Sequence, residues 1–377
     1  MNAVVAGYAR TPFTPAAKGA LAGVRPDDLV GALIAALVSR SGARADDVED
    51  LIVGCAFPEG EQGLNLARMA GLLAGLPKSV AAATVNRFCG SSMTAAHMAA
   101  GAVALGAGEL FVAAGVESMS RVPMGGFNPL PNPALAEVER GAYMGMGETA
   151  ENVAAKWAVS RRDQEAFALA SQRRAAQAQA EGRLTAEIVP VETRSGAIAA
   201  DGCLRPETTP EGLAALRPAF DENGVVTAGT ASPLTDGAAA VLIASEDYAR
   251  RMGLDILARI KSVAVCGCAP ELMGIGPIGA TRKALARAGL AARDLDVIEL
   301  NEAFAAQALA CARDLGLDLE KTNIDGGAIA LGHPLGATGA RILGKAASLL
   351  RREGGRYALA TQCIGGGQGI ATILEAV

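Results

Sequence analysis

The sequence is poor in aromatic side chains and in histidine. Phe, Trp and Tyr together make up 3% of the 377 residues, and there are only two histidines. Hydrophobic residues nevertheless reach 51%, and glycine occurs 46 times. A chain of this length and composition buries large cores, and we expect those cores to be packed from small side chains rather than from clusters of rings.

Runs of positive charge are missing as well. No basic run exceeds two residues and the net charge is -5, which excludes the electrostatic footprint of a nucleic-acid binder. The N-terminal stretch MNAVVAGYARTPF lacks the basic start, apolar core and cleavage site of a secretory signal, and we find no uncharged apolar stretch of membrane-spanning length. We therefore expect a soluble, cytoplasmic protein that neither binds nucleic acid nor inserts into a membrane.

The seven cysteines show no pattern of disulfides or metal ligands. They are odd in number and scattered, at positions 55, 89, 203, 266, 268, 311 and 363. Cys266 and Cys268 are separated by a single residue, so they do not have the CxxC spacing of a zinc or redox site. We therefore expect no disulfide framework and no metal site, and we expect most of these thiols to be small buried apolar residues.

Strand-like and helix-like segments alternate along the chain, and the alternation occurs twice. In the first half, strands are predicted at residues 2–9, 50–57, 79–86 and 109–116, with helices at 26–42 and 90–106. After residue 256, strands are predicted at 258–265, 296–300, 356–364 and 369–375, with helices at 277–289, 303–316 and 334–354. Alternation of this kind predicts a layered α/β fold with a largely parallel sheet.

The two copies also align locally. The stretch VSRSGARADDVEDLIVG in the first half matches LARAGLAARDLDVIELN in the second. Asn86, three residues before Cys89, corresponds to Asn323, three residues before Gly326. We therefore predict two pseudo-symmetric α/β domains, with a site where they meet.

The alternation breaks between the copies, in turns such as RVPMGGFNPLPNP and in a polar helix that carries Arg161, Arg162, Arg173 and Arg174. This segment is too long for a plain connection, so we expect an inserted cap with a binding task. Its arginines would suit an anionic, elongated ligand or form a solvated helix face. The predicted division is an N-terminal domain at 1–117 continued at 233–256, an inserted loop domain at 118–232, and a C-terminal domain at 257–377.

The stretch VNRFCGSSM places Cys89 between a predicted strand and a predicted helix. The thiol then sits at the positive end of the helix macrodipole, where a thiolate is favoured and free N–H groups surround it. This is a position suited to a nucleophile, although a cysteine near a helix start can also have no chemical role.

Three further motifs lie in turns after strands of the second half. GGAIALGHPLGATGAR puts His333 in a glycine-rich turn, and LATQCIGGGQG puts Cys363 before three glycines whose N–H groups can form an anion-binding nest. Asn301 follows the strand DVIEL and could donate a hydrogen bond, while Glu302 could equally be a helix-start carboxylate. Open α/β sheets bind ligands at such strand ends. Two thiols without metal or redox spacing suggest a covalent acyl carrier with a separate acid/base.

Two features are expected to have no catalytic role. His97 lies in the middle of a predicted helix and is expected to be a packed or surface residue. The stretch GIGPIG at residues 274–279 matches the GxGxxG pattern of dinucleotide-binding proteins, but it is separated from the preceding strand and contains Pro277. We therefore do not expect a dinucleotide site.

At these motifs the chain resembles the thiolases, a family of acetyl-CoA acyltransferases, from end to end. The matching stretches are VNRFCGSSM, GVESMSRVPM, TAENVA, LRPAF, VTAGTASPLTDGAAA, NEAFAAQ, GGAIALGHPLGATGAR and CIGGGQG, in family order. The resemblance implies a thiolase fold, in which two pseudo-symmetric duplicated α/β domains form a layered αβαβα arrangement with an inserted loop domain. It also implies thiolytic cleavage of 3-oxoacyl-CoA by coenzyme A to acetyl-CoA and a shortened acyl-CoA, a reversible Claisen condensation with ping-pong kinetics.

The resemblance assigns a role to each motif residue. Cys89 would take the acyl group as a thioester, His333 would polarise Cys89 towards thiolate, and Cys363 would be the second acid/base. Asn301, through a water, and His333 would form one oxyanion hole, while the backbone N–H groups of Cys89 and Gly365 would form the other. A thiol near its free pKa of about 8.5 suits proton exchange with the acetyl-CoA carbanion better than a carboxylate does.

Coenzyme A would lie across the inserted segment as a co-substrate, and the resemblance implies no other cofactor and no metal. The residues expected to contact CoA or the acyl chain are Arg205 at the nucleotide phosphates, Ser232 at the pantetheine, Met146 and Phe220 along an apolar tunnel, and Ala303 and Phe304 of the NEAF motif. Family members are dimers or tetramers, so a homo-oligomer is expected.

Two departures from the biosynthetic pattern favour the degradative branch, which works in fatty-acid β-oxidation. Gly145-Met146 stands where many biosynthetic members have His-Met, and Gly229-Thr230 stands where Gly-Asn is usual. The form VNRFCGSSM points the same way. These departures leave the acyl-chain length, the direction in the cell and the pathway open.

Other functions remain to be weighed against this one. A biosynthetic acetoacetyl-CoA thiolase is the nearest alternative. A ketosynthase-type condensing enzyme would normally use Cys-His-His or Cys-His-Asn without a second catalytic thiol, so Cys363 argues against it. A non-catalytic acyl-CoA or lipid-binding homologue would be expected to have lost Cys89, His333 or Cys363, and all three are present. A nucleotide-dependent dehydrogenase would rest on the GIGPIG stretch alone.

Overall fold

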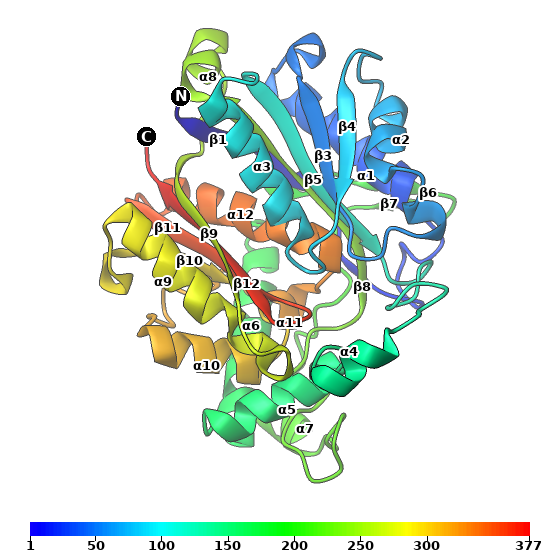
Figure 1. Ribbon diagram of the computed structural model, residues 1–377, viewed down its shortest axis with the longest axis vertical. Coiled ribbons are helices and arrows are strands. Elements are labelled where there is room, and N and C mark those ends of the chain that lie inside the picture. Colours follow the sequence, from blue (N-terminus) through cyan, green and yellow to red (C-terminus); the bar gives the residue numbers. More distant parts are fainter.

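One sheet of ten strands runs through both halves of the chain in the computed structural model, which describes residues 1–377 (Figure 1). The N-terminal half supplies β1 (Ala3–Arg10), β2 (Thr14–Pro15), β3 (Asp50–Gly54), β4 (Ala81–Val85), β5 (Leu110–Ser118) and β8 (Thr235–Ser245). The C-terminal half supplies β9 (Ala258–Gly267), β10 (Val297–Leu300), β11 (Tyr357–Ile364) and β12 (Gln368–Glu375). Within the sheet, the two halves join where β1 pairs with β9 at Val4 and Val5.

The pairing pattern confirms the duplication but corrects the expected strand direction. The strand order β3-β5-β8-β1 in one half is repeated as β10-β11-β12-β9 in the other, with the same parallel and antiparallel pairs. Only the pairs β3–β4, β3–β5 and β10–β11 are parallel, so the prediction of a largely parallel sheet is wrong. The reason is that β11 and β12 are joined by a short turn rather than by a helix, which makes them antiparallel.

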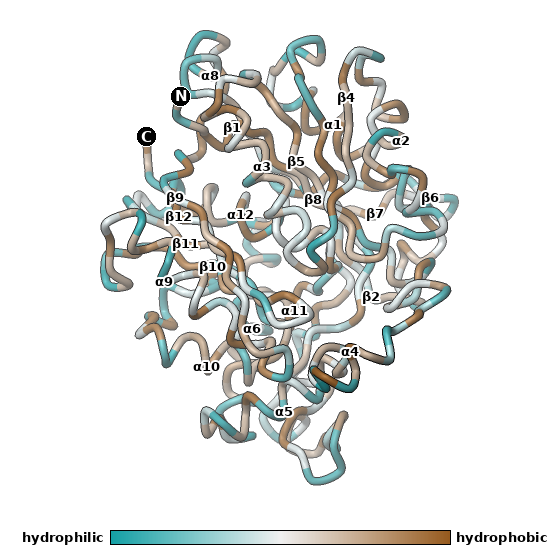
Figure 2. Tube along the Cα trace, in the orientation of Figure 1, coloured by the Kyte–Doolittle hydropathy of each residue, from teal (hydrophilic) through white to brown (hydrophobic).

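Helices form three layers around the two halves of the sheet, as the αβαβα prediction requires. On the outside of the N-terminal half lie α1 (Pro26–Ser41) and α2 (Leu66–Leu73), and on the outside of the C-terminal half lie α9 (Gly276–Ala288) and α10 (Ala305–Leu315). Between the halves lie α3 (Ser91–Leu105) and α12 (Leu335–Arg352), while the short helices α8 (Glu246–Met252) and α11 (Ala328–Leu331) lie near the layer ends. Figure 2 shows the apolar colour concentrated along the strands.

The middle layer is packed closely because small residues line it. A side chain at Gly339 of α12 would collide with the backbone of Met93 on α3, so the two helices approach at the distance that only glycine allows. The core between the halves is correspondingly rich in alanine, and α12 contacts strands of both halves. The core between the halves is therefore built largely from small side chains, as the composition predicted.

The segment Phe88–Leu105 corrects one expectation from the sequence. It is uncharged, 18 residues long and apolar enough to cross a membrane by length and composition alone. The expectation that the chain has no such stretch is therefore wrong. In the structure, 56% of it is buried, and it forms the middle-layer helix α3 with the turn that precedes it. The same composition therefore reflects burial between two sheet halves.

The segment between β5 and β8 lies mainly against the C-terminal half. It contains α4 (Pro133–Val138), α5 (Met146–Lys156), α6 (Arg161–Ala180), α7 (Pro210–Ala214) and the hairpin of β6 (Val191–Thr193) and β7 (Gly196–Ile198). Helix α5 contacts α10 and the 3-10 helix η4 (Pro270–Ile275), and α6 contacts α10 and α11. The remaining 3-10 helices are η1 (Ala45–Asp47), η2 (Gly60–Gln62), η3 (Thr185–Glu187) and η5 (Ala292–Asp294).

Candidate active site

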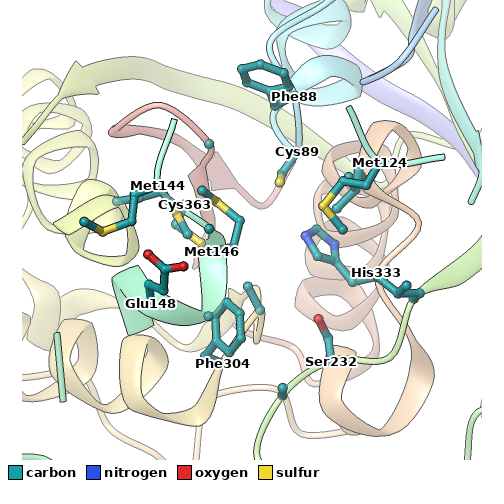
Figure 3. A pocket seen from close by; sticks show the side chains of 18 of the residues that line it. Phe88, Cys89, Met124, Met144, Met146, Glu148, Ser232, Phe304, His333 and Cys363 are labelled. Atoms are coloured by element: carbon teal, nitrogen blue, oxygen red, sulfur yellow. The ribbon is translucent and has the colours of Figure 1, made fainter. Parts of the chain in front are cut away.

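A cavity of about 530 Å³ lies where the two halves and the inserted segment meet. Its lining includes Cys89 from the first half, His333 and Cys363 from the second, and Met146 from α5. Figure 3 shows the two thiols and the imidazole pointing into the same space from different elements. The duplicated fold thus brings together side chains that are up to 274 positions apart, as the numbers of Cys89 and Cys363 show (363 - 89 = 274).

A tight turn between β4 and α3 presents the Cys89 thiol. Phe88 adopts a left-handed conformation with φ 43°, which few non-glycine residues do. The Ser91 hydroxyl supports the turn because it donates to the Phe88 carbonyl at 2.6 Å and accepts from the Arg87 N–H at 2.9 Å. Helix α3 then begins at Ser91, so Cys89 sits just before the helix N-terminus as predicted.

The electrostatics of Cys89 differ from the expectation that a thiolate is favoured. Burial raises the pKa of Cys89 to about 11, and the backbone N–H groups of Gly365 and of Cys89 itself lower it only in part. Desolvation therefore outweighs these two N–H groups. The thiol is neutral at pH 7 and must lose its proton to a base before it can attack.

The turn that carries Cys363 packs directly on the turn that carries Cys89. A side chain at Gly90 would collide with Ile364, and the Gln362 side-chain amide donates to the Cys89 carbonyl. Cys363 is fully buried at the end of β11, and the glycines that follow it turn the chain back into β12. Burial, and then the neighbouring Cys89, raise the pKa of Cys363 well above its ordinary value, rather than leaving it near the free value.

His333 lies in the turn between α11 and α12, and hydrogen bonds hold its ring on two sides. The Nδ1 atom is 2.6 Å from the Thr338 hydroxyl, and the Nε2 atom is 3.5 Å from the side-chain amide nitrogen of Asn301. Its backbone N–H donates to Thr235 Oγ1 at 3.0 Å. Burial, and then the charge of Arg341, lower the pKa of His333 to about 3, so the imidazole is neutral and can accept a proton.

Asn301 and Glu302 follow β10 but have different surroundings. Asn301 is buried next to His333, and its side-chain oxygen makes no hydrogen bond, so that oxygen is free to orient a water. The Glu302 carboxylate instead accepts from Ser171 and Asn323, each at 2.7 Å, and from the Ile329 N–H at 3.1 Å. Glu302 therefore ties three segments together, and its bond to Ile329 places the carboxylate at the start of α11.

Five of the six residues expected to contact CoA or the acyl chain line the cavity, namely Ser232, Met146, Phe220, Ala303 and Phe304. The rings of Phe220 and Phe304 pack edge to face with centroids 5.8 Å apart. Arg205 does not line the cavity; it is exposed, and its backbone N–H donates to the Gln172 side chain. Its role at the nucleotide phosphates stays a prediction.

The arginines of α6 mostly serve the fold. Arg161 donates to the carbonyls of Leu213, Ala214 and Leu216, and Arg174 donates to those of Leu319 and Thr322. These bonds tie α6 to neighbouring loops, which leaves the two guanidinium groups less available for an anionic ligand. The GIGPIG stretch is also structural, since a side chain at Gly276 would collide with the backbone of β12 at Gln368.

Several cavity residues were not identified from the sequence. Phe57, Phe88, Met124 and Met144 add apolar surface around the thiols, and Glu148 is the one carboxylate among the lining residues. Thr338 was also missed, and its place five residues after His333 at the start of a helix was the only available signal. Tertiary contacts rather than motifs identify these residues.

Comparison with known proteins was consistent along the whole chain. The model of the thiolase N-terminal domain matches residues 3–247, and that of the thiolase C-terminal domain matches residues 254–376. The 3-ketoacyl-CoA thiolase of Bacillus subtilis is 48% identical over 99% of both chains, and that of Shewanella frigidimarina is 50% identical over the full length of both. The crystal structure of human mitochondrial 3-ketoacyl-CoA thiolase superposes with a TM-score of 0.92 at 39% identity, covering 100% of this chain and 99% of that one.

Proposed function

This chain belongs to the thiolase family, and from that premise we propose that it is an acetyl-CoA C-acyltransferase that cleaves 3-oxoacyl-CoA with coenzyme A. The products are acetyl-CoA and an acyl-CoA shortened by two carbons. The observation that carries the proposal is the convergence of Cys89, His333 and Cys363 from both halves of the fold on one cavity. A biosynthetic acetoacetyl-CoA thiolase is not favoured, because the full-length relatives are named as 3-ketoacyl-CoA thiolases.

In the first half-reaction, Cys89 attacks the 3-oxo carbon while His333 accepts the thiol proton on Nε2. The bond between C2 and C3 then breaks, the acyl group stays on Cys89 as a thioester, and Cys363 donates its proton to the acetyl-CoA enolate. The neutral His333 and the protonated Cys363 have the protonation states that these two steps require at pH 7.

In the second half-reaction, coenzyme A enters as the acyl acceptor. The Cys363 thiolate takes the proton of the CoA thiol, the CoA sulfur attacks the acyl thioester, and the Cys89 sulfur leaves. His333 returns its proton to Cys89, so the enzyme ends in its starting state. Because acetyl-CoA leaves before CoA reacts, the kinetics are ping-pong.

Negative charge develops on two different oxygens during the two half-reactions, the enolate oxygen of acetyl-CoA and the acyl oxygen on Cys89, so two sets of donors are needed. We assign the enolate oxygen of acetyl-CoA to His333 and to Asn301 acting through a water. The acyl oxygen on Cys89 is assigned to the backbone N–H groups of Cys89 and Gly365. Supporting observations are the closeness of Asn301 to His333 and the effect of both backbone N–H groups on the Cys89 pKa.

The assay that tests the function follows loss of 3-oxoacyl-thioester absorbance when acetoacetyl-CoA and CoA are mixed with the protein. We expect Cys89→Ala to abolish turnover with circular dichroism unchanged, because no acyl thioester can form. Cys266→Ala is the matched control, since Cys266 lies outside the cavity, and it should retain full activity. Turnover by Cys89→Ala at the parent rate would contradict the mechanism.

The same assay across 3-oxoacyl-CoA chain lengths tests the degradative assignment. The apolar lining of Phe57, Phe88, Met124 and Met144 supports substrates longer than acetoacetyl-CoA. A profile restricted to the four-carbon substrate would overturn it. Coenzyme A is a co-substrate in this scheme, and we propose no other cofactor or metal, because side chains supply the nucleophile and both acids. Activity should therefore be unchanged by a chelator.

We propose that the protein is a homodimer or homotetramer in the cytoplasm. Strand β4 ends the sheet with one edge unpaired, and large apolar side chains are exposed near it, including Leu64, Leu72 and Leu73. A second copy would cover both features. The seven free thiols suit a reducing compartment. Sedimentation analysis and cell fractionation test these two statements.

A further inference from the structure

The Thr338 hydroxyl has two neighbours that compete for its single proton. Its Oγ1 atom is 2.6 Å from His333 Nδ1 and 3.1 Å from the Pro334 carbonyl oxygen, and the side chain is buried on the first turn of α12. A hydroxyl can donate only one hydrogen bond but can also accept one. The direction in which this hydroxyl points therefore determines which ring nitrogen of the neutral imidazole carries the hydrogen.

Two arrangements of the Thr338 proton fit these contacts, because the Pro334 carbonyl also accepts from the backbone N–H groups of Ala337 and Thr338. In the first, Thr338 donates to the Pro334 carbonyl and accepts from Nδ1–H, which leaves Nε2 bare and able to take a proton. In the second, Thr338 donates to Nδ1, and Nε2 carries a hydrogen that can be donated to an oxyanion. In the proposed mechanism His333 acts in both ways, as a base towards Cys89 and as a hydrogen-bond donor towards the enolate oxygen.

We propose that Thr338 is a positioning residue whose hydroxyl lets His333 act first as a base and then as an oxyanion donor. The inference rests on the proposed thiolase function. When His333 takes the Cys89 proton, the ring carries hydrogens on both nitrogens, and Nδ1–H donates to Thr338, which donates onward to Pro334. Without the hydroxyl, that Nδ1–H would be buried with no partner, so proton transfer from Cys89 would be disfavoured.

The charged groups around this pair are the same in every variant compared below. Arg341 is on the same helix and is held by Glu299 at 2.7 Å, and Glu117 on β5 is the carboxylate that acts on Cys89. A change in the pH dependence of Cys89 on substitution of Thr338 therefore reports the lost hydroxyl.

The other histidine provides a matched control. His97 Nε2 is 2.8 Å from the Thr372 hydroxyl, but His97 does not line the cavity. Thr372→Val removes the same hydroxyl from an equivalent pair that has no catalytic role. Thr338→Ser keeps the hydroxyl at the catalytic pair and should behave as the parent protein does.

The experiment measures alkylation of Cys89 by iodoacetamide from pH 6 to 10, with the site identified by mass spectrometry, alongside thiolysis. For Thr338→Val we expect Cys89 alkylation at pH 7 to slow by about 10- to 100-fold and its pH profile to move upward by one unit or more. We expect kcat to fall by a similar factor with KM little changed. Thr338→Ser and Thr372→Val should stay within about threefold of the parent, because both leave the Nδ1 partner of His333 in place.

An alkylation profile that is unchanged in Thr338→Val, while the parent cleaves substrate normally, would overturn the proposal. A parent protein without thiolysis would instead overturn the proposed function, which keeps the two failures distinct. If Thr338→Val does not fold, Thr338→Ala removes the same hydroxyl with less bulk, and the same alkylation shift is expected. Loss of thermal stability without a shift in alkylation would show a structural role only and would also overturn the proposal.

Discussion

The two histidines share a threonine partner and a lowered pKa, but they differ in backbone position and in what surrounds them. A ring nitrogen of each is hydrogen-bonded to a threonine hydroxyl. The N···O distance is 2.6 Å for His333 Nδ1 and 2.8 Å for His97 Nε2. Burial lowers the pKa of each to about 3. Only His333 lines a cavity, and only His333 shares that cavity with two thiols. A perturbed pKa therefore does not identify the catalytic histidine in this protein, whereas its exposure to the cavity does.

The backbone explains the difference. His333 lies in a turn that precedes α12 and follows Gly332, whose φ of 105° a larger residue would rarely adopt. His97 lies within α3, and its ring crosses to β12 of the other half. His97 is half-buried within a helix and does not line the cavity, while His333, in a turn at the end of a layer, faces it.

The largest effect should separate the two histidines directly. We expect His333→Gln to reduce kcat/KM by about 10³-fold, because it removes both the base and an oxyanion donor. His97→Gln keeps a polar group towards Thr372 and should leave turnover within about threefold of the parent. The measurement is the thiolysis assay on both folded variants. Similar losses of kcat/KM in the two variants would show that His333 is no more important for catalysis than His97.

A second prediction extends the comparison to two buried thiols. Cys363→Ser should lower kcat by about 10²-fold, because a serine hydroxyl is a much weaker acid and cannot protonate the enolate efficiently. Cys311→Ser is the matched change outside the cavity, where the buried thiol donates to the Gly274 carbonyl at 3.3 Å. It should have little effect on turnover. Equal rates for the two variants would argue against a proton role for Cys363.

Both histidines should make the stability of the protein depend on pH, because burial lowers the pKa of each. Both have a folded-state pKa of about 3 and an ordinary value of 6.5, so the unfolded chain binds their protons first. Their contribution to stability is complete above pH 6.5 and is lost as the pH falls from there towards 3. His97→Gln should therefore reduce the acid loss of unfolding free energy by up to about 1.4 kcal/mol per pH unit. Urea unfolding of the variant and the parent at pH 7, 6 and 5 measures this slope, and identical slopes would contradict the assigned burial.

The smallest effect is expected at the control hydroxyl. Thr372→Val should cost about 1 kcal/mol of unfolding free energy, because it leaves His97 Nε2 without its partner. Turnover should not change. Urea unfolding at pH 7 gives the stability difference, and a decrease in kcat would show that the interface of α3 and β12 is coupled to the cavity.

Much of the fold could be predicted from the sequence because periodic burial is a local signal. All strands predicted for the two copies form, and the local match of the halves corresponds to the repeated strand order. Strand direction was predicted wrongly, because pairing depends on which strands meet across the sheet. Strand β8 was not predicted at all, since it returns from the inserted segment to pair with β5 and β1.

The site divides in the same way. The motif residues Cys89, His333 and Cys363 could be selected from the sequence because they lie in turns, Cys89 and Cys363 after strands and His333 in a glycine-rich turn that enters a helix. The acidities of these residues could not be predicted from the sequence. Burial raises the pKa of Cys89 to about 11, although the thiol lies just before a helix. Arg205, which was chosen by resemblance, lies outside the cavity, and its contact with the CoA phosphates stays a prediction. The burial of a thiol and the distance of a side chain from the cavity both depend on the complete tertiary structure.

The sequence by itself determined the duplicated α/β pattern, the family resemblance and the residue types able to form and break a thioester. Only the tertiary structure showed how His333 meets those thiols in one cavity, and only it placed Thr338 at His333 Nδ1. The physical reason is that chemical identity and helical or strand periodicity are properties of short segments. Solvent exclusion, hydrogen-bond partners and proton affinity arise where segments from the two halves meet.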